Sequence, residues 1–313
     1  MTRIFTLTLN PSLDRTYNIS ILKPGTYHRG RITSRDPGGK GINVSRSLQN
    51  LGVPSTICGF FGGRTGASMV SDLYRLGFQI LPVWVEEETR SNITILEAES
   101  SRMTKLNEVG PQVSNSEAQK MLDLVGGNTL SGDRWVFSGS LPPGLSSGYY
   151  AQLMEVVRAA GGISYLDTSG APLGGAMKVV PDVLRINTSE AGQLAGQSLS
   201  SEVELVSALK KLVFSGIGCV YISAGEQGAW LGVENGWYRA DAPSIEVRNT
   251  VGAGDAMLSA LIWAELDNKS AEEQLRAGVA AGSASCELEG TAAVEIDRLV
   301  ELTSSITVES GDW

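Results

Sequence analysis

The chain has 313 residues, of which 42% are hydrophobic, and a formal net charge of −9. This length and composition predict a folded protein with a sizeable core, and the acidic balance argues against a nucleic acid or an anionic membrane as partner. No apolar run approaches the ~18 residues of a membrane span, and the first residues lack the pattern of a signal peptide. Three widely spaced cysteines favour a reducing, cytoplasmic location, and a single histidine, His28, argues against a zinc or triad site.

The charge is unevenly distributed along the chain. Residues 1–110 hold 13 Lys/Arg against 9 Asp/Glu, so the net charge of this third is positive although the whole chain is acidic. A local excess of basic residues suits an anionic ligand, but ordinary solvated charges explain it equally well.

Short apolar runs alternate with helix-length amphipathic segments along most of the chain. We expect strands at residues 5–9, 56–61, 80–85, 135–138, 163–167, 183–187 and 220–223, and the first helical segments at 43–51 and 65–76. This alternation predicts an α/β fold with a mostly parallel sheet and helices on both of its faces.

Two polar stretches, at about 15–36 and 90–109, interrupt this alternation. Both have the character of extended strands without intervening helices, as in RITSRD and SNITILEAE. A small sheet built from two such excursions could act as a lid over the core. With no repeat or linker in the sequence, we expect one domain over residues 1–313 that carries this lid.

Ligands of open α/β sheets bind beyond the carboxyl ends of the strands, so motifs at these positions are candidate sites. Asp14, after the first strand, could accept hydrogen bonds from sugar hydroxyls or cap a turn. The sequence from Asp36 to Asn43, DPGGKGIN, places Gly39 and Lys40 at a helix start suited to an anion, although a tight turn with a solvated lysine is the alternative.

The middle of the chain contains two further candidates. Arg90 opens a predicted lid strand with Asn92 on the same face, and its guanidinium suits a phosphate, although a surface ion pair with residues 86–88 is the simpler explanation. Ser138 begins the loop SGSLPPG, which forms either a wall of the substrate site or a plain turn.

Three motifs follow later strands. Asn187 and Glu190 in NTSE could hold hydrated Mg²⁺ or form a helix cap. The segment SAGEQGA, with Ser223, Gly225 and Gly228, could pass under a nucleotide or form a hairpin turn.

The segment TVGAGD, residues 250–255, combines glycines, a predicted helix start and an acid. Its amides could bind a phosphate while Asp255 accepts a proton, or it could be a glycine-rich turn with an acid favoured by the helix dipole. The sequence contains neither a Walker A loop nor a GxGxxG fingerprint.

Together these motifs resemble the phosphofructokinase-B family of the ribokinase-like superfamily. The most similar branch acts on hexose phosphates and contains 1-phosphofructokinase, tagatose-6-phosphate kinase and the minor 6-phosphofructokinase. The resemblance covers nearly the whole chain through the segments TLTLNPSLD, PGGKGINVSRSLQNLG, TRSNI, SGSLPPG, NTSE, SAGEQGA, NTVGAGDAM and GVAAGSAS.

The resemblance implies a three-layer α/β/α fold with a small β lid, often shared across a homodimer, and transfer of the ATP γ-phosphoryl group to a sugar phosphate. It implies Asp255 as base, an anion hole at Gly252, Ala253 and Gly254, and Mg²⁺ held through water by Asn187 and Glu190. The nucleotide would lie along Asn187, Ser223, Gly225, Gly228, Gly252 and Gly254. The sugar phosphate would contact Asp14, Gly39, Lys40, Asn43, Arg90, Asn107 and Ser138, with the partner's Arg29. A monovalent cation near the anion hole also follows from the family.

Two features bear on the nucleotide and the substrate. The family commonly has Lys-Pro-Asn where this chain has Arg185-Ile186-Asn187, which keeps the charge and loses the stiffness of proline. Asn107 favours 1-phosphofructokinase, whereas GYYAQLM and YRADAPSIEVRN favour tagatose-6-phosphate kinase. We therefore expect fructose 1-phosphate as the first candidate substrate, followed by tagatose 6-phosphate and then fructose 6-phosphate.

A sugar-phosphate sensor without catalytic activity is the alternative from another functional class. The missing GxGxxG disfavours a nicotinamide-dependent oxidoreductase.

Overall fold

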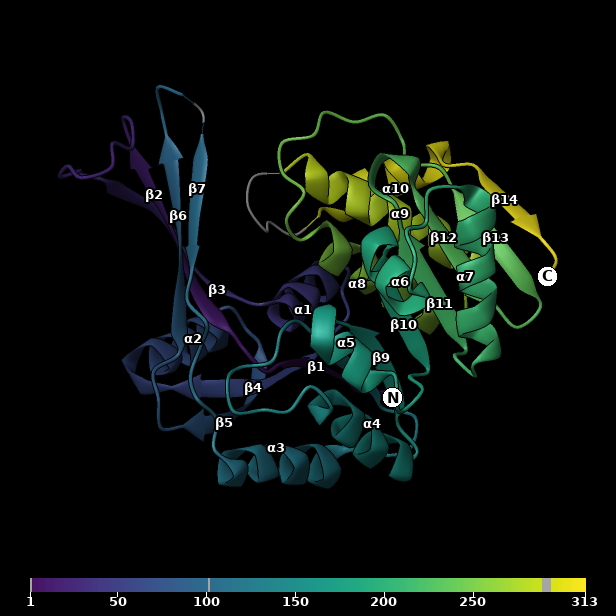
Figure 1. The fold of residues 1–313 in the computed structure, drawn as a ribbon, viewed down its shortest axis with the longest axis horizontal. Helices are drawn as coiled ribbons and strands as arrows, with labels where there is room; N and C mark the ends of the chain where they lie inside the picture. Colours follow the sequence, from purple (N-terminus) through teal and green to yellow (C-terminus); the bar gives the residue numbers. More distant parts are fainter. Residues whose placement is uncertain (1, 101, 289–293) are drawn as a thin grey trace.

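The computed structural model of the protein describes residues 2–100, 102–288 and 294–313. Its main sheet has the order β14-β13-β12-β11-β10-β9-β8-β1-β4-β5 (Figure 1). The strands from β5 to β11 are parallel, and β12, β13 and β14 extend the sheet in antiparallel fashion. They span β1 Ile4–Thr8, β4 Thr56–Gly62, β5 Gln79–Val85, β8 Arg134–Ser138, β9 Ile163–Asp167, β10 Val183–Asn187, β11 Cys219–Ser223, β12 Ala229–Val233, β13 Gly236–Ala240 and β14 Val308–Gly311.

Helices cover both faces of this sheet because its central strands are apolar on both sides. In β1, Phe5 and Leu7 belong to a core with α3–α7, whereas Ile4 belongs to a second core with α1 and α8–α10. The helices span α1 Lys40–Asn50, α2 Gly63–Arg75, α3 Asn115–Asn128, α4 Tyr149–Ala159, α5 Gly170–Ala176, α6 Thr188–Ala195, α7 Glu202–Phe214, α8 Ala253–Leu266, α9 Ala271–Cys286 and α10 Ile296–Ser305. None of the helices in the described ranges is long and apolar enough to cross a membrane.

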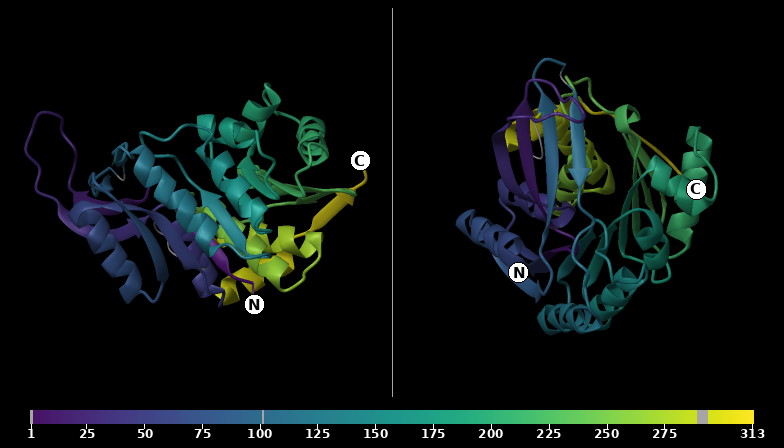
Figure 2. Two further views of the ribbon diagram at one scale, coloured as in Figure 1. Left: turned by 90° about the horizontal axis from the view of Figure 1, so that it is seen from below. Right: turned by 60° about the vertical axis from the view of Figure 1, so that its left-hand side comes forward.

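A separate four-stranded sheet, which we call the lid, has the order β3-β2-β6-β7. Its strands are β2 Ser12–Ile19, β3 Arg31–Gly38, β6 Arg90–Glu97 and β7 Met103–Asn107. The two central strands, β2 and β6, pair in parallel, and each also pairs with an antiparallel neighbour. Figures 1 and 2 show the lid projecting from the end of the molecule opposite β14.

The predicted fold class, a three-layer α/β/α core with a mostly parallel sheet and a small β lid, is confirmed. The first lid excursion is longer than predicted, since β2 begins at Ser12 and β3 continues to Gly38. Asp14 therefore lies within a lid strand, and the alternative that it caps a turn after the first strand does not hold. Only three residues separate β1 from β2. Pro11 therefore lies in a short connection between the main sheet and the lid, and not in a long loop.

Candidate active site

Asp255 lies in the first turn of α8 and is only 3% exposed. The helix is preceded by Gly252, whose φ of 90° lies in the left-handed region that favours glycine. Among the described residues the amides of Gly252 and Gly254 donate no hydrogen bond, and Ala253 makes only a long bond of 3.4 Å to the Thr250 carbonyl. Unpaired amides at a helix start attract anions, so this turn can bind a phosphate beside a carboxylate.

Two side chains of α1 hold the Asp255 carboxylate. Lys40 Nζ lies 2.9 Å from Oδ1, and Asn43 Nδ2 donates to Oδ2 at 2.9 Å. Burial opposes the charge of Lys40, but Asp167 and Asp255 raise its pKa above the ordinary lysine value, so it carries a positive charge. The base candidate is thus oriented by an amide and paired with a cation.

Sequence reasoning missed Asp167, the last residue of β9, which is 1% exposed. Its Oδ2 lies 3.1 Å from Lys40 Nζ and its Oδ1 3.6 Å from Arg185 Nη1. Burial alone would raise the pKa of Asp167, but Lys40 and Arg185 hold it below the ordinary value. A signal existed, because Asp167 ends a predicted parallel strand whose neighbours end in Ser138 and Asn187.

Arg185, the departure from the family pattern, lies directly beside the start of α8. Its Nη2 donates to Ser223 Oγ at 2.8 Å, and the side chain is buried. A Cβ atom at position 254 would clash with Arg185 Nη1, so a larger residue would require the guanidinium to move. The cation therefore lies against the same turn that presents the unpaired amides.

The lid contributes a second polar group centred on Asp14. Its Oδ1 accepts hydrogen bonds from Ser12 Oγ at 2.7 Å and from Asn92 Nδ2 at 2.9 Å. Burial raises the pKa of Asp14 despite these bonds and the nearby Arg90. A side chain at Gly38 would overlap the Asp14 carboxylate, so the glycine before the α1 turn makes room for it.

Arg90 opens β6 at the base of the lid. Its Nε and Nη2 donate to the Asn10 carbonyl at 3.2 and 3.0 Å, and its Nη1 donates to the Glu108 carbonyl at 3.0 Å. It forms no ion pair with residues 86–88, so the alternative of a surface salt bridge does not hold in the described structure. Asn107 ends β7 opposite Asn92 and is exposed.

Two further predicted residues are Ser138, at the end of β8, and Gly39, directly before α1. Ser138 is fully buried at the end of β8, and within the described residues its Oγ has no hydrogen-bond partner. Gly39 precedes α1 with a φ of 127°, and a Cβ atom there would lie 2.5 Å from Thr8 Cγ2. The glycine therefore allows the α1 turn to approach β1 closely, and the Ser138 hydroxyl is a buried polar group without a protein partner in the described residues.

Comparison with known proteins identifies this arrangement. The model of the pfkB family carbohydrate kinases matches residues 7–297. The chain belongs to this family. It is an ATP-dependent sugar kinase, and its buried carboxylate at a helix start with unpaired amides lies within the matched region.

Solved structures of pfkB kinases match over nearly the full length. Phosphofructokinase-2 from Escherichia coli in complex with potassium is 31% identical, with 97% of this chain and 99% of that chain covered and a TM-score of 0.93. The structure of the same enzyme with substrates and products is also 31% identical, with a TM-score of 0.91 and the same coverage of both chains. A Thermotoga maritima protein described as "Possible 1-phosphofructokinase" is 25% identical, with 99% and 100% covered and a TM-score of 0.85.

In this pfkB kinase the predicted metal residues form a helix cap. Glu190 Oε2 accepts from the Asn187 amide at 2.8 Å, and Asn187 Oδ1 accepts from the Glu190 amide at 2.9 Å. The second Glu190 carboxylate oxygen makes no hydrogen bond in the described part of the chain. No group of three acidic, His or Cys side chains that could cage a metal occurs there either. The helix-cap interpretation of NTSE is therefore correct, and the second Glu190 oxygen is the atom that a water of hydrated Mg²⁺ could contact.

The segment predicted to pass under the nucleotide is a hairpin between antiparallel β11 and β12. Gly225 and Gly228 have φ values of 59° and 87°, and a Cβ atom at Gly228 would clash with the Ala240 carbonyl. The turn interpretation of SAGEQGA is therefore correct. Because Ser223 lies opposite Asn187 at the strand ends, the hairpin still borders the site.

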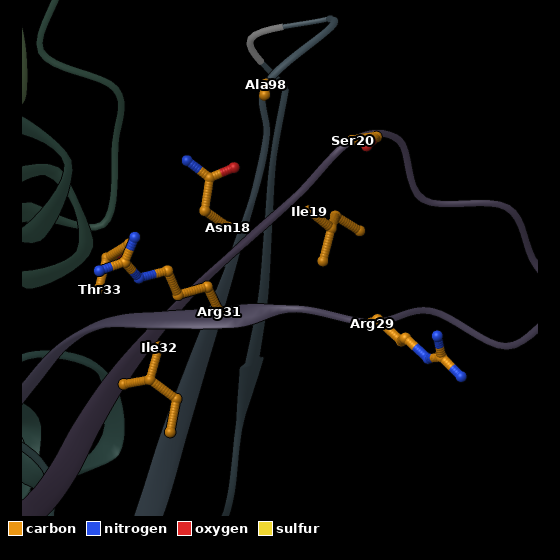
Figure 3. Close-up of a pocket in the computed structure, with 8 residues that line it drawn as sticks. All are labelled: Asn18, Ile19, Ser20, Arg29, Arg31, Ile32, Thr33 and Ala98. Carbon is orange, nitrogen blue, oxygen red and sulfur yellow. The ribbon is translucent and has the colours of Figure 1, made fainter.

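Arg29 lies far along the lid, between β2 and β3, and is exposed. It borders a pocket of about 550 Å³ whose other lining residues are Asn18, Ile19, Ser20, Arg31, Ile32, Thr33 and Ala98 (Figure 3). The structure therefore does not bring Arg29 together with Asp255 within one chain.

Proposed function

We propose that the kinase converts a ketohexose phosphate into the bisphosphate, with fructose 1-phosphate as the first candidate substrate and cytoplasm as its location. Residues 1–313 would form one kinase domain with the lid as its movable part. The observation that carries this proposal is the buried Asp255 carboxylate, held by Asn43 and Lys40 beside unpaired amides. The second polar group, around Asp14 and Arg90, can take the far end of a sugar phosphate.

Asp255 would accept the proton of the attacking sugar hydroxyl. Asn43 donates to Oδ2 and Lys40 contacts Oδ1, so the carboxylate is held in a fixed orientation for this role. The amides of Gly252, Ala253 and Gly254 would then stabilise charge on the transferring group, which needs positioning and neutralisation more than covalent chemistry.

The sugar would lie between core and lid. Asp14 and Asn43 would bind its hydroxyls, Gly39 would allow close approach, Ser138 would donate its unpaired hydroxyl, and Asn107 would reach it from β7. Arg90 would bind the phosphate that the sugar already carries, because its planar guanidinium matches phosphate geometry. Lys40 would serve the transferring group instead, since it contacts Asp255 and Asp167.

We infer a homodimer through the lid, in which the partner's Arg29 completes the phosphate site. The support is that Arg29 is exposed and remote from Asp255 in its own chain, while the lid also exposes Ile32, Met103 and Leu106. Exposed apolar side chains on a small sheet favour association.

The nucleotide would lie along Asn187, Ser223, Gly225 and Gly228, with Arg185 beside its phosphates. Mg²⁺ would neutralise phosphate charge, held through water by Asn187 and Glu190. A monovalent cation near the anion hole is part of the proposal, since one E. coli relative is described in complex with potassium.

An ADP-release assay tests the proposal. Fructose 1-phosphate, tagatose 6-phosphate, fructose 6-phosphate and the unphosphorylated sugars would be compared by kcat/KM, with ATP and Mg²⁺ held constant. We expect the highest value for fructose 1-phosphate. A preference for either 6-phosphate assigns the alternative substrates. Turnover of unphosphorylated sugars alone contradicts the bisphosphate proposal, and binding without turnover identifies a sensor.

A further inference from the structure

Among the described residues, Asp167 is a buried carboxylate of the site for which the proposed reaction supplies no task. It is 1% exposed, carries a charge, and contacts two cations from different elements, Lys40 of α1 and Arg185 of β10. A buried carboxylate beside a phosphate site opposes anion binding unless its charge serves another purpose. Its position therefore needs an explanation.

We propose that Asp167 is a positioning residue that fixes Lys40 between the base and the transferring phosphoryl group. The proposal rests on the role proposed for Asp255. Lys40 Nζ lies 2.9 Å from Asp255 and 3.1 Å from Asp167, so the ammonium is held from two sides. A lysine with one carboxylate partner can still move, because its side chain is flexible. Two carboxylates on different elements restrict the ammonium to one position between them.

The support of Asp167 is rigid enough for this task. Its backbone carbonyl accepts from the Gly139 amide at 3.0 Å, and the neighbouring Thr168 Oγ1 donates to the Gly139 carbonyl at 2.7 Å. Tyr150 Oη donates to the same carbonyl at 3.0 Å. The ends of β8 and β9 are thereby tied together, and the carboxylate cannot follow a moving lysine.

Arg185 favours the charged form of Asp167. Its contact of 3.6 Å is longer than the 3.1 Å contact of Lys40, so Lys40 is the closer partner of Asp167. The charges of Lys40, Arg185, Asp167 and Asp255 balance to zero without a phosphate. The two carboxylate oxygens of Asp167 face different cations, Oδ2 toward Lys40 and Oδ1 toward Arg185.

The effect on the rate follows from geometry. Without Asp167, Lys40 retains Asp255 as its single carboxylate partner, and its flexible stem can then carry the ammonium out of the phosphoryl path. This loss of position lowers kcat while both substrates still bind. A misplacement of about 1 Å in a phosphoryl-transfer site can reduce the rate ~100-fold.

The test is a double-mutant cycle with Asp167→Asn and Lys40→Met in the full-length protein, using the best substrate of the panel above. We expect Asp167→Asn to lower kcat by about 10- to 100-fold, with KM for either substrate changed less than about threefold. In the Lys40→Met background, Asp167→Asn should lower kcat by less than about threefold. Asp167→Glu should recover part of kcat because it restores the carboxylate.

Asp133→Asn is the matched control, because Asp133 is also a buried, ion-paired aspartate but pairs with Arg3 away from the site. It should lower Tm without changing kcat. Equal losses from Asp167→Asn in both Lys40 backgrounds overturn the proposal, as does an unchanged kcat. A raised Mg²⁺ requirement would instead assign Asp167 to the metal. Retained activity of Asp255→Asn would reject the role of the base, whatever the cycle gives.

Discussion

Asn43 and Asp255 are 212 positions apart in the chain, yet the Asn43 amide donates to the Asp255 carboxylate at 2.9 Å. Each residue lies near the start of a helix, α1 and α8, and these helices pack in one core. The contact therefore joins the sequence segments GGKGIN and TVGAGD into one site. Their combination carries the chemistry that neither segment specifies alone.

Replacing the base should abolish turnover without preventing nucleotide binding. We expect Asp255→Asn to lower kcat by about 10²- to 10⁴-fold, because a positioned proton acceptor contributes this much. ATP affinity, measured by calorimetry, should stay within about threefold. Asp267→Asn is the control, since Asp267 ends the same helix and is exposed. Near-normal turnover by Asp255→Asn would remove Asp255 from the mechanism.

Arg90→Ala should act mainly on the sugar phosphate. We expect its KM to rise about tenfold or more, with KM for ATP unchanged, because a guanidinium–phosphate contact is lost. Arg75→Ala, on exposed α2 surface, provides the control. If Arg90 serves only to bind the Asn10 carbonyl, Arg90→Ala will lower Tm and leave KM for the sugar phosphate unchanged.

The raised pKa of Asp14 predicts a substitution that stabilises the protein while weakening substrate binding. A carboxyl whose folded-state pKa lies above its ordinary value of 3.8 destabilises the fold when ionised, and this cost disappears at lower pH. Asp14→Asn should therefore raise Tm at pH 7 by about 2 °C, the shift expected for roughly 1 kcal/mol in a chain of this size.

The gain in Tm for Asp14→Asn should vanish below about pH 4, where the wild-type carboxyl is neutral as well. KM for the sugar phosphate should increase at the same time. A Tm gain that persists at pH 3 would show that shape, not charge, is the cause.

Glu190 can be tested against an internal duplicate. Glu190 and Glu273 occupy the same capping-box position of α6 and α9, and glutamine can keep the cap in both. Glu190→Gln should raise the Mg²⁺ concentration for half-maximal activity by about tenfold. Glu273→Gln should leave it unchanged, and chelation of Mg²⁺ should abolish activity. Identical behaviour of the two variants would leave Glu190 as a cap only.

The sequence predicted the core strands well because each is a short apolar run buried on both faces. The ranges 163–167 and 183–187 coincide with β9 and β10. The segment LNPSLD was predicted less well, since proline and asparagine are typical of turns, whereas Asp14 lies in β2, a strand of the lid. Local propensity cannot indicate which of two sheets a strand joins.

The role of Asp167 could not be read from local pattern either. One acid at the end of an apolar run has no motif, and its partners, Lys40 and Arg185, lie far away in the sequence. The parallel order of the strands supplies the missing information, because it gathers all carboxyl ends at one edge. Topology would have to be known before Asp167 could be chosen.

The strands that carry Asp14, Asn92 and Arg90 belong to the lid, whereas Asn43 and Asp255 belong to the core. If the sugar phosphate touches both sets, as we propose, it would hold the lid against the core. Closure would then depend on occupancy by the acceptor, because water alone cannot span the two sets of residues. The division of the binding residues between two sheets would in this way oppose wasteful cleavage of ATP.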